Sequence, residues 1–338
     1  MLDLALERNL ALGAAAAIDA VRLVSAGHPA RYGSRRIVAA NRVIGVDLGG
    51  TKIAAGIIDR EGKVQARSVR PTPTDSEHAL VATLGDAIEE LLDGETGAVG
   101  LGVPSTVDQQ TGRAVASVNI PLKDVPLRDL MSQRFGIPCG IDNDANAAAI
   151  GEWQVGAGKG TRDMVMLTLG TGVGGGLILN GRPYRGSLGA AAELGHMVIE
   201  HDGRPCQGNC TGRGHIEAYA TGVAAGKDWG SDSRDLIAKA HEGDAKALEL
   251  LESIGHRLGS AIGTLVNIFD PEVVVIGGGF GEAADEFLLG PAREVMLREA
   301  LLPARDRVRL VPAALGPEAG LVGAGFVAFE ALDSSEDW

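Results

Sequence analysis

The chain contains one unit twice: a hydrophobic strand, a glycine-rich loop and a second hydrophobic strand. Residues 42–59 read RVIGVDLGGTKIAAGIID, and residues 163–179 read DMVMLTLGTGVGGGLIL. β-Branched runs broken by glycine pairs are typical of strands joined by tight turns. Because helical patterns follow each copy, the duplication predicts a two-lobed α/β protein with a cleft between the lobes.

The remaining patterns divide the chain into three parts. Residues 1–40 are rich in alanine and form an N-terminal extension, which could be an ordered helix, a mobile arm or sequence upstream of the functional start. Residues 41–150 are expected to form a small N-terminal lobe, to which a closing helix at 319–333 returns. Residues 151–318 are expected to form the large C-terminal lobe.

Composition excludes several classes of function. With 44 acidic and 31 basic residues among 338, the net charge of −13 disfavours a nucleic-acid partner, because phosphate contacts need clustered Lys and Arg. No stretch of about 18 uncharged apolar residues exists, so no membrane span is expected. Three cysteines are too few for a disulfide framework, and no secretory signal pattern opens the chain. These features favour a cytoplasmic protein.

Glycine-rich segments suit phosphate or nucleoside binding. In DLGGTK, Gly49 and Gly50 would let backbone N–H groups reach phosphate oxygens, and Asp47 could hold Mg²⁺. TLGTGVGGG (residues 168–176) contains GxGxxG, but a strand follows where the dinucleotide fingerprint needs a helix. VVVIGGGF (residues 273–280) ends a buried strand in glycines, at the edge where open α/β sheets bind ligands. Each segment alone could equally be a tight turn.

A cluster of acidic and amide side chains lies between a strand and a helix. The segment IDNDANAAA places Asp142, Asn143 and Asp144 there. Helix capping is the ordinary role of such residues, and one of them suffices for it. An Asp in a cleft can also accept the proton of an attacking hydroxyl, as phosphoryl transfer to an alcohol requires.

The segment GRPCQGNCTGRGHIE, residues 203–217, suggests a metal site. It contains Cys206, Cys210 and His215, and His196 lies ten residues before the first cysteine. Two cysteines and two histidines would complete a closed tetrahedral Zn²⁺ site. The alternative is a flexible glycine-rich loop with two thiols.

Taken in order, these motifs resemble the ROK family of repressors and sugar kinases, especially its glucokinases. The matching segments span roughly residues 42–330 and read DLGGTK, NDANAAAIGE, TLGTGVGGG, ELGH, the Cys/Gly segment ending in HIE, and FDPEVVVIGGG. The resemblance implies an actin-like ATPase fold with a ribonuclease H-like sheet in each lobe. It also implies ATP-dependent phosphorylation of glucose at the 6-hydroxyl, with Mg²⁺, a structural Zn²⁺ and a homo-oligomer, either dimer or tetramer.

The resemblance assigns roles to individual residues, with Asp144 as the general base. The residues expected to contact the sugar are Asn119, Asn143, Asp144, Glu193, His196 and Glu217. Those expected around ATP are Asp47, Gly49, Gly50, Thr51, Lys52, Gly170, Thr171, Gly172, Gly277, Gly278 and Gly279. The expected zinc ligands are His196, Cys206, Cys210 and His215.

One departure from the family pattern concerns the metal. The usual motif is CxCGxxGCxE, whereas here His215 stands at the third cysteine position and three residues separate the first two cysteines. Zn²⁺ accepts such a His₂Cys₂ set. Kinases for N-acetylmannosamine, N-acetylglucosamine, fructose, mannose or allose share every motif, and polyphosphate could replace ATP. A sugar-responsive repressor is less favoured, because about 40 residues before DLGGT are too few for a winged-helix domain.

Overall fold

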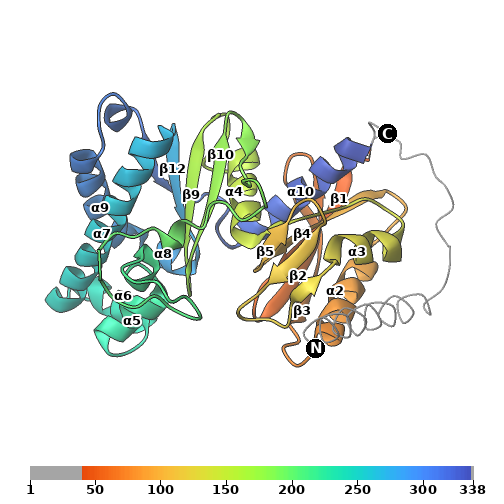
Figure 1. The fold of residues 1–338 in the computed structure, drawn as a ribbon, viewed down its shortest axis with the longest axis horizontal. Coiled ribbons are helices and arrows are strands. Elements are labelled where there is room, and N and C mark those ends of the chain that lie inside the picture. Colours follow the sequence, from red (N-terminus) through yellow and green to blue (C-terminus); the bar gives the residue numbers. More distant parts are fainter. Residues whose placement is uncertain (1–39, 336–338) are drawn as a thin grey trace, which may run out of the picture.

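The duplicated unit forms the centre of each of two sheets with the same strand order (Figure 1). The structure is a computed structural model that describes residues 40–335, so residues 1–39 of the expected extension lie outside it. The first sheet has the order β3-β2-β1-β4-β8, and the second has the order β11-β10-β9-β12-β13. In both sheets an antiparallel hairpin continues into parallel strands. The expected α/β duplication is therefore confirmed.

Each glycine loop joins the two strands of a hairpin. The strands of the first sheet are β1 (Arg42–Leu48), β2 (Lys52–Asp59), β3 (Val64–Pro71), β4 (Thr96–Val103) and β8 (Cys139–Asn143). The strands of the second sheet are β9 (Met164–Leu169), β10 (Val173–Leu179), β11 (Arg182–Pro183), β12 (Val273–Gly277) and β13 (Arg309–Pro312). A small sheet contains β5 (Thr106–Asp108), β6 (Arg113–Ala116) and β7 (Lys123–Val125).

Outer helices complete a separate apolar core for each sheet. The first core includes α2 (Glu77–Leu91) and α3 (Leu127–Phe135). The second core includes α5 (Gly222–Trp229), α6 (Ser233–His241), α7 (Ala245–Phe269), α8 (Gly279–Ala283) and α9 (Asp285–Glu299). Figure 1 shows these two groups at opposite ends of the molecule.

Helices α4 (Asp144–Val155) and α10 (Ala319–Ser335) form a central layer between the sheets. Helix α10 can lie directly on the first sheet because glycines face it. A Cβ atom on Gly100 would lie 1.9 Å from the carbonyl oxygen of Ala324, closer than any side chain tolerates. The two helices also touch through a glycine, since a Cβ on Gly323 would lie 1.6 Å from the Ala147 carbonyl oxygen. This close packing fixes where the halves meet.

The chain crosses between the halves at residues 156–163, which join α4 to β9, and at residues 313–318, which join β13 to α10. The boundary expected at residue 150 falls inside α4. The helix continues past Ile150 through the buried residues Gly151 and Glu152, and it ends at Gly156. No helix within residues 40–335 combines the length and apolar character that a membrane crossing requires.

Candidate active site

Asp144 lies at the first turn of α4, directly after β8. The preceding residue, Asn143, is the N-cap: its side-chain oxygen accepts hydrogen bonds from the N–H groups of Ala145 at 2.9 Å and Asn146 at 3.2 Å. Its amide nitrogen also faces the Ser105 carbonyl oxygen at 3.4 Å. Capping is therefore done by Asn143. The Asp144 carboxylate accepts the backbone N–H groups of Ala145 and of Asp144 itself, and it is available for chemistry.

The surroundings of Asp144 suit a base that works near neutral pH. The pKa of Asp144 is raised to about 6, mainly because burial removes the carboxylate from water. The hydrogen bond from the Ala145 N–H opposes this rise. The negative charges of Asp47 and Glu193 raise the pKa further. These two carboxylates come from opposite halves of the molecule. Asp144 thus lies where the end of β1 meets the segment that carries Glu193.

A buried ion pair supports the strand that leads into the first turn of α4. Asp142 in β8 has no exposed surface and accepts hydrogen bonds from Arg185 Nε at 2.6 Å and Asn146 Nδ2 at 3.0 Å. Arg185 also donates to both carboxylate oxygens of Glu330 on α10, at 3.0 and 2.6 Å. Sequence reasoning missed Arg185, since no local motif marks it.

The first glycine loop is a tight turn at the end of the β1–β2 hairpin. The Gly49 N–H donates to the Lys52 carbonyl oxygen at 2.9 Å. Asp47, half-buried beside the loop, has a raised pKa because of desolvation, which the nearby Lys52 charge partly offsets. Asn119 is exposed, and its Cβ atom lies 3.9 Å from the position that a Cβ atom on Gly50 would take. The loop, with exposed Thr51, therefore lies next to one expected sugar contact.

The second glycine loop opens onto a cavity of about 700 Å³. Gly170 and Thr171 line it, and Gly279 of α8 lines it from the other side. Gly277 and Gly278, which were also expected around ATP, do not line the cavity. Gly277 is buried against Met166. Gly278 has a positive φ of 83°, a backbone conformation that favours glycine. The residues that line this cavity and were not anticipated from the sequence are Gly222, Val223, Gly226, Ser231, Asp232, Ser233, Arg234, Ile237, Phe280 and Ala283.

The four expected zinc ligands converge. Their ligand atoms all lie within 4.8 Å of one another, which makes them the candidate metal cluster among the described residues. The Nδ1 atoms of His196 and His215 are 3.2 Å apart, Cys206 Sγ lies 3.7 Å from His196 Nδ1, and Cys210 Sγ lies 3.6 Å from His215 Nδ1. A tetrahedral zinc with bonds of ~2.0–2.3 Å holds its ligand atoms roughly 3.3–3.8 Å apart. The three separations given above, 3.2 to 3.7 Å, lie close to this range, and the whole cluster spans up to 4.8 Å.

Glu217 connects this cluster to the second glycine loop. One carboxylate oxygen accepts the Val173 N–H at 2.9 Å, and the other lies 3.7 Å from Cys206 Sγ. A Cβ on Gly172 would lie 2.6 Å from the Glu217 carboxylate. Because His196 turns Nδ1 toward the cluster, its Nε2 points elsewhere and is available to a ligand.

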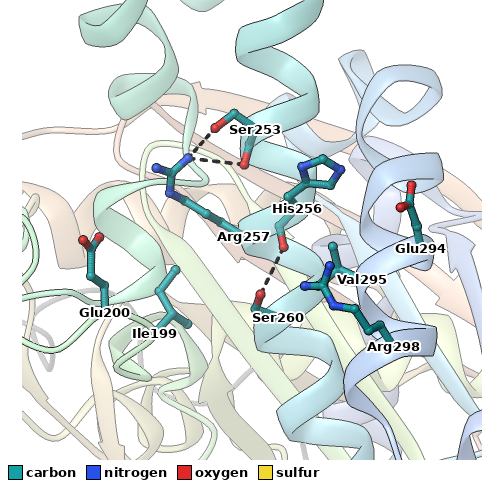
Figure 2. Close-up of a pocket in the computed structure, with 9 residues that line it drawn as sticks. All are labelled: Ile199, Glu200, Ser253, His256, Arg257, Ser260, Glu294, Val295 and Arg298. Carbon is teal, nitrogen blue, oxygen red and sulfur yellow. Dashed lines mark hydrogen bonds between the residues drawn. The ribbon is translucent and has the colours of Figure 1, made fainter.

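Figure 2 shows a separate cavity of about 470 Å³ between α7, α9 and the segment that precedes the cysteine loop. Arg257 and Arg298 line it together with Glu200 and Glu294, so its charges balance. None of the expected site residues lines this cavity. The residues expected to form the active site therefore lie elsewhere in the molecule.

Known proteins resemble this chain over most of its length. The sequence pattern of the ROK family matches residues 43–330. A glucokinase of Halalkalibacterium halodurans is 36% identical over 321 residues, which cover 87% of this chain and 96% of the relative. The solved structure of a ROK family glucokinase from Streptomyces griseus in complex with glucose and AMPPNP has a TM-score of 0.74 at 33% identity, covering 86% of this chain and 99% of that one.

A ROK hexokinase from Thermus thermophilus is similar to the same extent. Its structure has a TM-score of 0.75 at 36% identity and covers 88% of this chain and 100% of that one. Together with the two sheets of equal strand order, these likenesses confirm the expected actin-like ATPase fold.

Proposed function

This chain belongs to the ROK family, and on that premise we propose that it is a glucokinase, which transfers the terminal phosphoryl group of ATP to the 6-hydroxyl of glucose. One observation carries the proposal above the others. Asp144, with a pKa raised to about 6, lies at the start of α4, within electrostatic reach of Asp47 beside one glycine loop and of Glu193 beside the sugar-contact segment. A base in this position serves transfer to an alcohol.

The reaction needs positioning more than covalent chemistry from the protein. The Asp144 carboxylate takes the proton of the 6-hydroxyl as that oxygen attacks the terminal phosphorus and ADP leaves. The remaining hydroxyls of the sugar find hydrogen-bond donors and acceptors on five further side chains: Asn119, Asn143, Glu193, His196 through Nε2, and Glu217. A neutral sugar is recognised by such groups, and an analogue that lacks a bonded hydroxyl leaves one of them unpaired.

The phosphates of ATP would lie against backbone N–H groups of the two glycine loops, and its nucleoside in the 700 Å³ cavity beside Gly279. Asp47 and the exposed Lys52 stand at the first loop. A half-buried carboxylate at this position fits the role of a ligand for Mg²⁺, directly or through water. The ion would supply positive charge to the phosphates, and Asp47 would hold it in place.

We further propose that the four-residue cluster holds one structural zinc ion. Support comes from the interatomic distances, which match tetrahedral Zn²⁺, and from the chemistry of two thiols with two imidazoles. With Cys206 and Cys210 fixed, Glu217 is held between the metal loop and Val173. Zinc in this position orders the sugar-binding surface and is not the catalytic Lewis acid.

We also propose a cytoplasmic homo-oligomer, dimer or tetramer. The support is an exposed apolar patch at the ends of α7 and α9, where Ile268, Leu297, Leu301 and Leu302 are between 42% and 70% exposed. Such a patch is typical of an interface between subunits. Light scattering coupled to size exclusion would measure the mass, and a monomer at micromolar concentration would contradict this assignment.

An ADP-release assay tests the proposed activity. The purified protein is mixed with ATP and Mg²⁺ and with one hexose at a time: glucose, mannose, fructose, allose, N-acetylglucosamine or N-acetylmannosamine. Glucose is expected to give the highest kcat/KM. A second arm replaces ATP by polyphosphate and measures the sugar phosphate directly, because no ADP forms from this donor. It is expected to give little product, because the nucleoside cavity then stays empty. If none of the six hexoses supports turnover, the kinase assignment is overturned. A higher kcat/KM for another hexose than for glucose would reassign the substrate to that hexose.

A further inference from the structure

Glu152 is a buried carboxylate that the catalytic scheme does not use. It closes the segment NDANAAAIGE and has no exposed surface. Its side chain accepts hydrogen bonds from the N–H groups of Ala157 at 2.8 Å, Ala314 at 3.0 Å and Leu315 at 2.7 Å. No Lys or Arg pairs with it among the described residues. The carboxylate is therefore held by backbone dipoles alone, which is costly unless every oxygen is satisfied.

The donors come from both places where the chain crosses between the halves. Ala157 lies in the first crossing, 156–163, and Ala314 and Leu315 lie in the second, 313–318. The second pair is more than 160 residues away from Glu152 in sequence. One carboxylate thus joins the C-terminal end of α4 to the chain just before α10.

The contacts next to Glu152 indicate that the two halves turn about the C-terminal end of α4. Gly151 packs against the α10 backbone, where a Cβ would lie 2.7 Å from the Ala319 carbonyl oxygen. Trp153 Nε1 donates to the Thr161 carbonyl oxygen at 2.8 Å, which ties the far end of the first crossing to α4. Hinges absorb motion at a few element ends, and here both element ends are fastened to one side chain.

We propose that Glu152 is a positioning residue that fixes the hinge axis between the two halves. Helix α4 begins at Asp144 and ends beside Glu152, so the angle set at the hinge determines where the base meets the second glycine loop. The proposal rests on the proposed kinase function, in which closure of the cleft aligns sugar, base and ATP. Glu152 acts through α4 and touches no substrate.

The variant Glu152→Gln tests this role. The amide keeps the size of the side chain but turns an N–H donor toward a backbone N–H, so one crossing loses its acceptor. Glu272 offers a control at the far end of the first crossing: it accepts the N–H groups of Arg162 at 2.6 Å and Asp163 at 3.3 Å, next to β9. Among the described residues its side chain accepts no hydrogen bond from the second crossing. Glu272→Gln therefore weakens an exposed contact of the first crossing but leaves the link between the two crossings intact.

Kinetics and solution scattering are measured for wild type and both variants. Glu152→Gln is expected to lower kcat by about 10- to 100-fold and to raise the KM for glucose, because misalignment on the ångström scale is that costly. Glu272→Gln is expected to keep both constants. If Glu152→Gln does not fold, Glu152→Asp, which keeps the charge but shortens the reach, is judged by the same criteria.

Small-angle scattering separates failure of the hinge assignment from failure of the proposed function. Without ligands, Glu152→Gln must show a larger radius of gyration than wild type and Glu272→Gln. Equal radii, or a folded Glu152 variant with wild-type kcat and KM, overturn the hinge assignment. Wild-type protein that phosphorylates no hexose overturns the proposed function, and the hinge assignment then stands or falls on the unliganded radii.

Discussion

Arg185 donates its Nε–H across 2.6 Å to the carboxylate of Asp142, which has no exposed surface. Arg185 follows β11 of the second sheet, and Asp142 lies in β8 of the first. The ion pair therefore joins the halves within two residues of Asp144, the proposed base. Burial is the main cause that raises the pKa of Asp142, and the Arg185 charge and hydrogen bond oppose that rise.

Replacing Arg185 by Ala is expected to lower the free energy of unfolding by about 3–5 kcal/mol, since it leaves a buried carboxylate without its partner. Glu330→Gln is the control: the Glu330 side chain is half-exposed, so its loss is expected to cost about 0–1 kcal/mol. Urea unfolding followed by circular dichroism measures both. If both variants lose the same free energy of unfolding, the pairing of Arg185 with buried Asp142 does not contribute more stability than its pairing with Glu330.

Asp144→Asn is expected to lower kcat by about 10²–10⁴-fold while glucose still binds, because only the proton acceptor is lost. In the wild type, kcat/KM is expected to fall as the pH drops through about 6, since the base must be ionised. Initial rates between pH 5 and 8.5 and calorimetric titration with glucose measure these effects. Wild-type turnover in the variant would refute the assignment of the base.

The substitution Asp144→Asn is also expected to stabilise the folded protein at high pH. The folded pKa of Asp144 is about 6 against 3.8 for the free group, so ionisation costs folded-state stability at higher pH. Asp144→Asn should therefore raise the thermal midpoint at pH 8, and the gain should shrink as the pH falls toward 4. A gain that grows on acidification would show that the pKa is lowered instead.

His215→Ala is expected to lose the metal, and His215→Cys is expected to keep it, because thiolate and imidazole are both good zinc ligands. Elemental analysis should give about one zinc per chain for wild type and for His215→Cys. Chelation of the wild type should lower the thermal midpoint and the affinity for glucose together, since the metal would order the loop that carries Glu217. A metal-free protein with full stability and activity would refute the zinc assignment.

Gly279→Ala tests the nucleotide cavity. A Cβ at Gly279 meets no atom within 4 Å, so the substitution is expected to leave stability unchanged. A nucleotide packed against this backbone would meet the methyl group, and the KM for ATP should rise about tenfold, the equivalent of a small overpacking cost. Gly290→Ala is the control, because its site is equally open but lies in α9, away from the cavity. An unchanged KM for ATP at Gly279 would place the nucleotide elsewhere.

Features that depend on short stretches of sequence could be predicted. The glycine loops, the strand–helix junction at Asp144 and the convergence of four metal-binding side chains all follow from spacing within a few tens of residues. The family resemblance already proposed Asp144 as the base; the structure adds that Asn143, and not Asp144, caps α4. The boundary expected at residue 150 falls inside α4, which runs on to Val155, because no local pattern in the sequence marks where that helix ends.

The contacts that join the halves could not be predicted from the sequence. Arg185 and Asp142 are 43 residues apart, and Glu152 and Ala314 are 162 apart. Neither pair has a periodic or motif signature, and each forms because the duplicated sheets place unrelated segments together. The cavity beside Gly279 was missed in part for the same reason, since α5 and α6 reach it only through the packing of the second core.

The position of α10 also has a consequence for the order in which a nascent chain can fold. Its side chains Leu321, Ala328, Phe329 and Leu332 pack against Val43, Ile58 and Ala98 of the first sheet. During synthesis that sheet leaves the ribosome with one face bare, and its cover is made only after the entire second half. The first half must wait, exposed to chaperones and to aggregation, while the second half can complete its core beforehand.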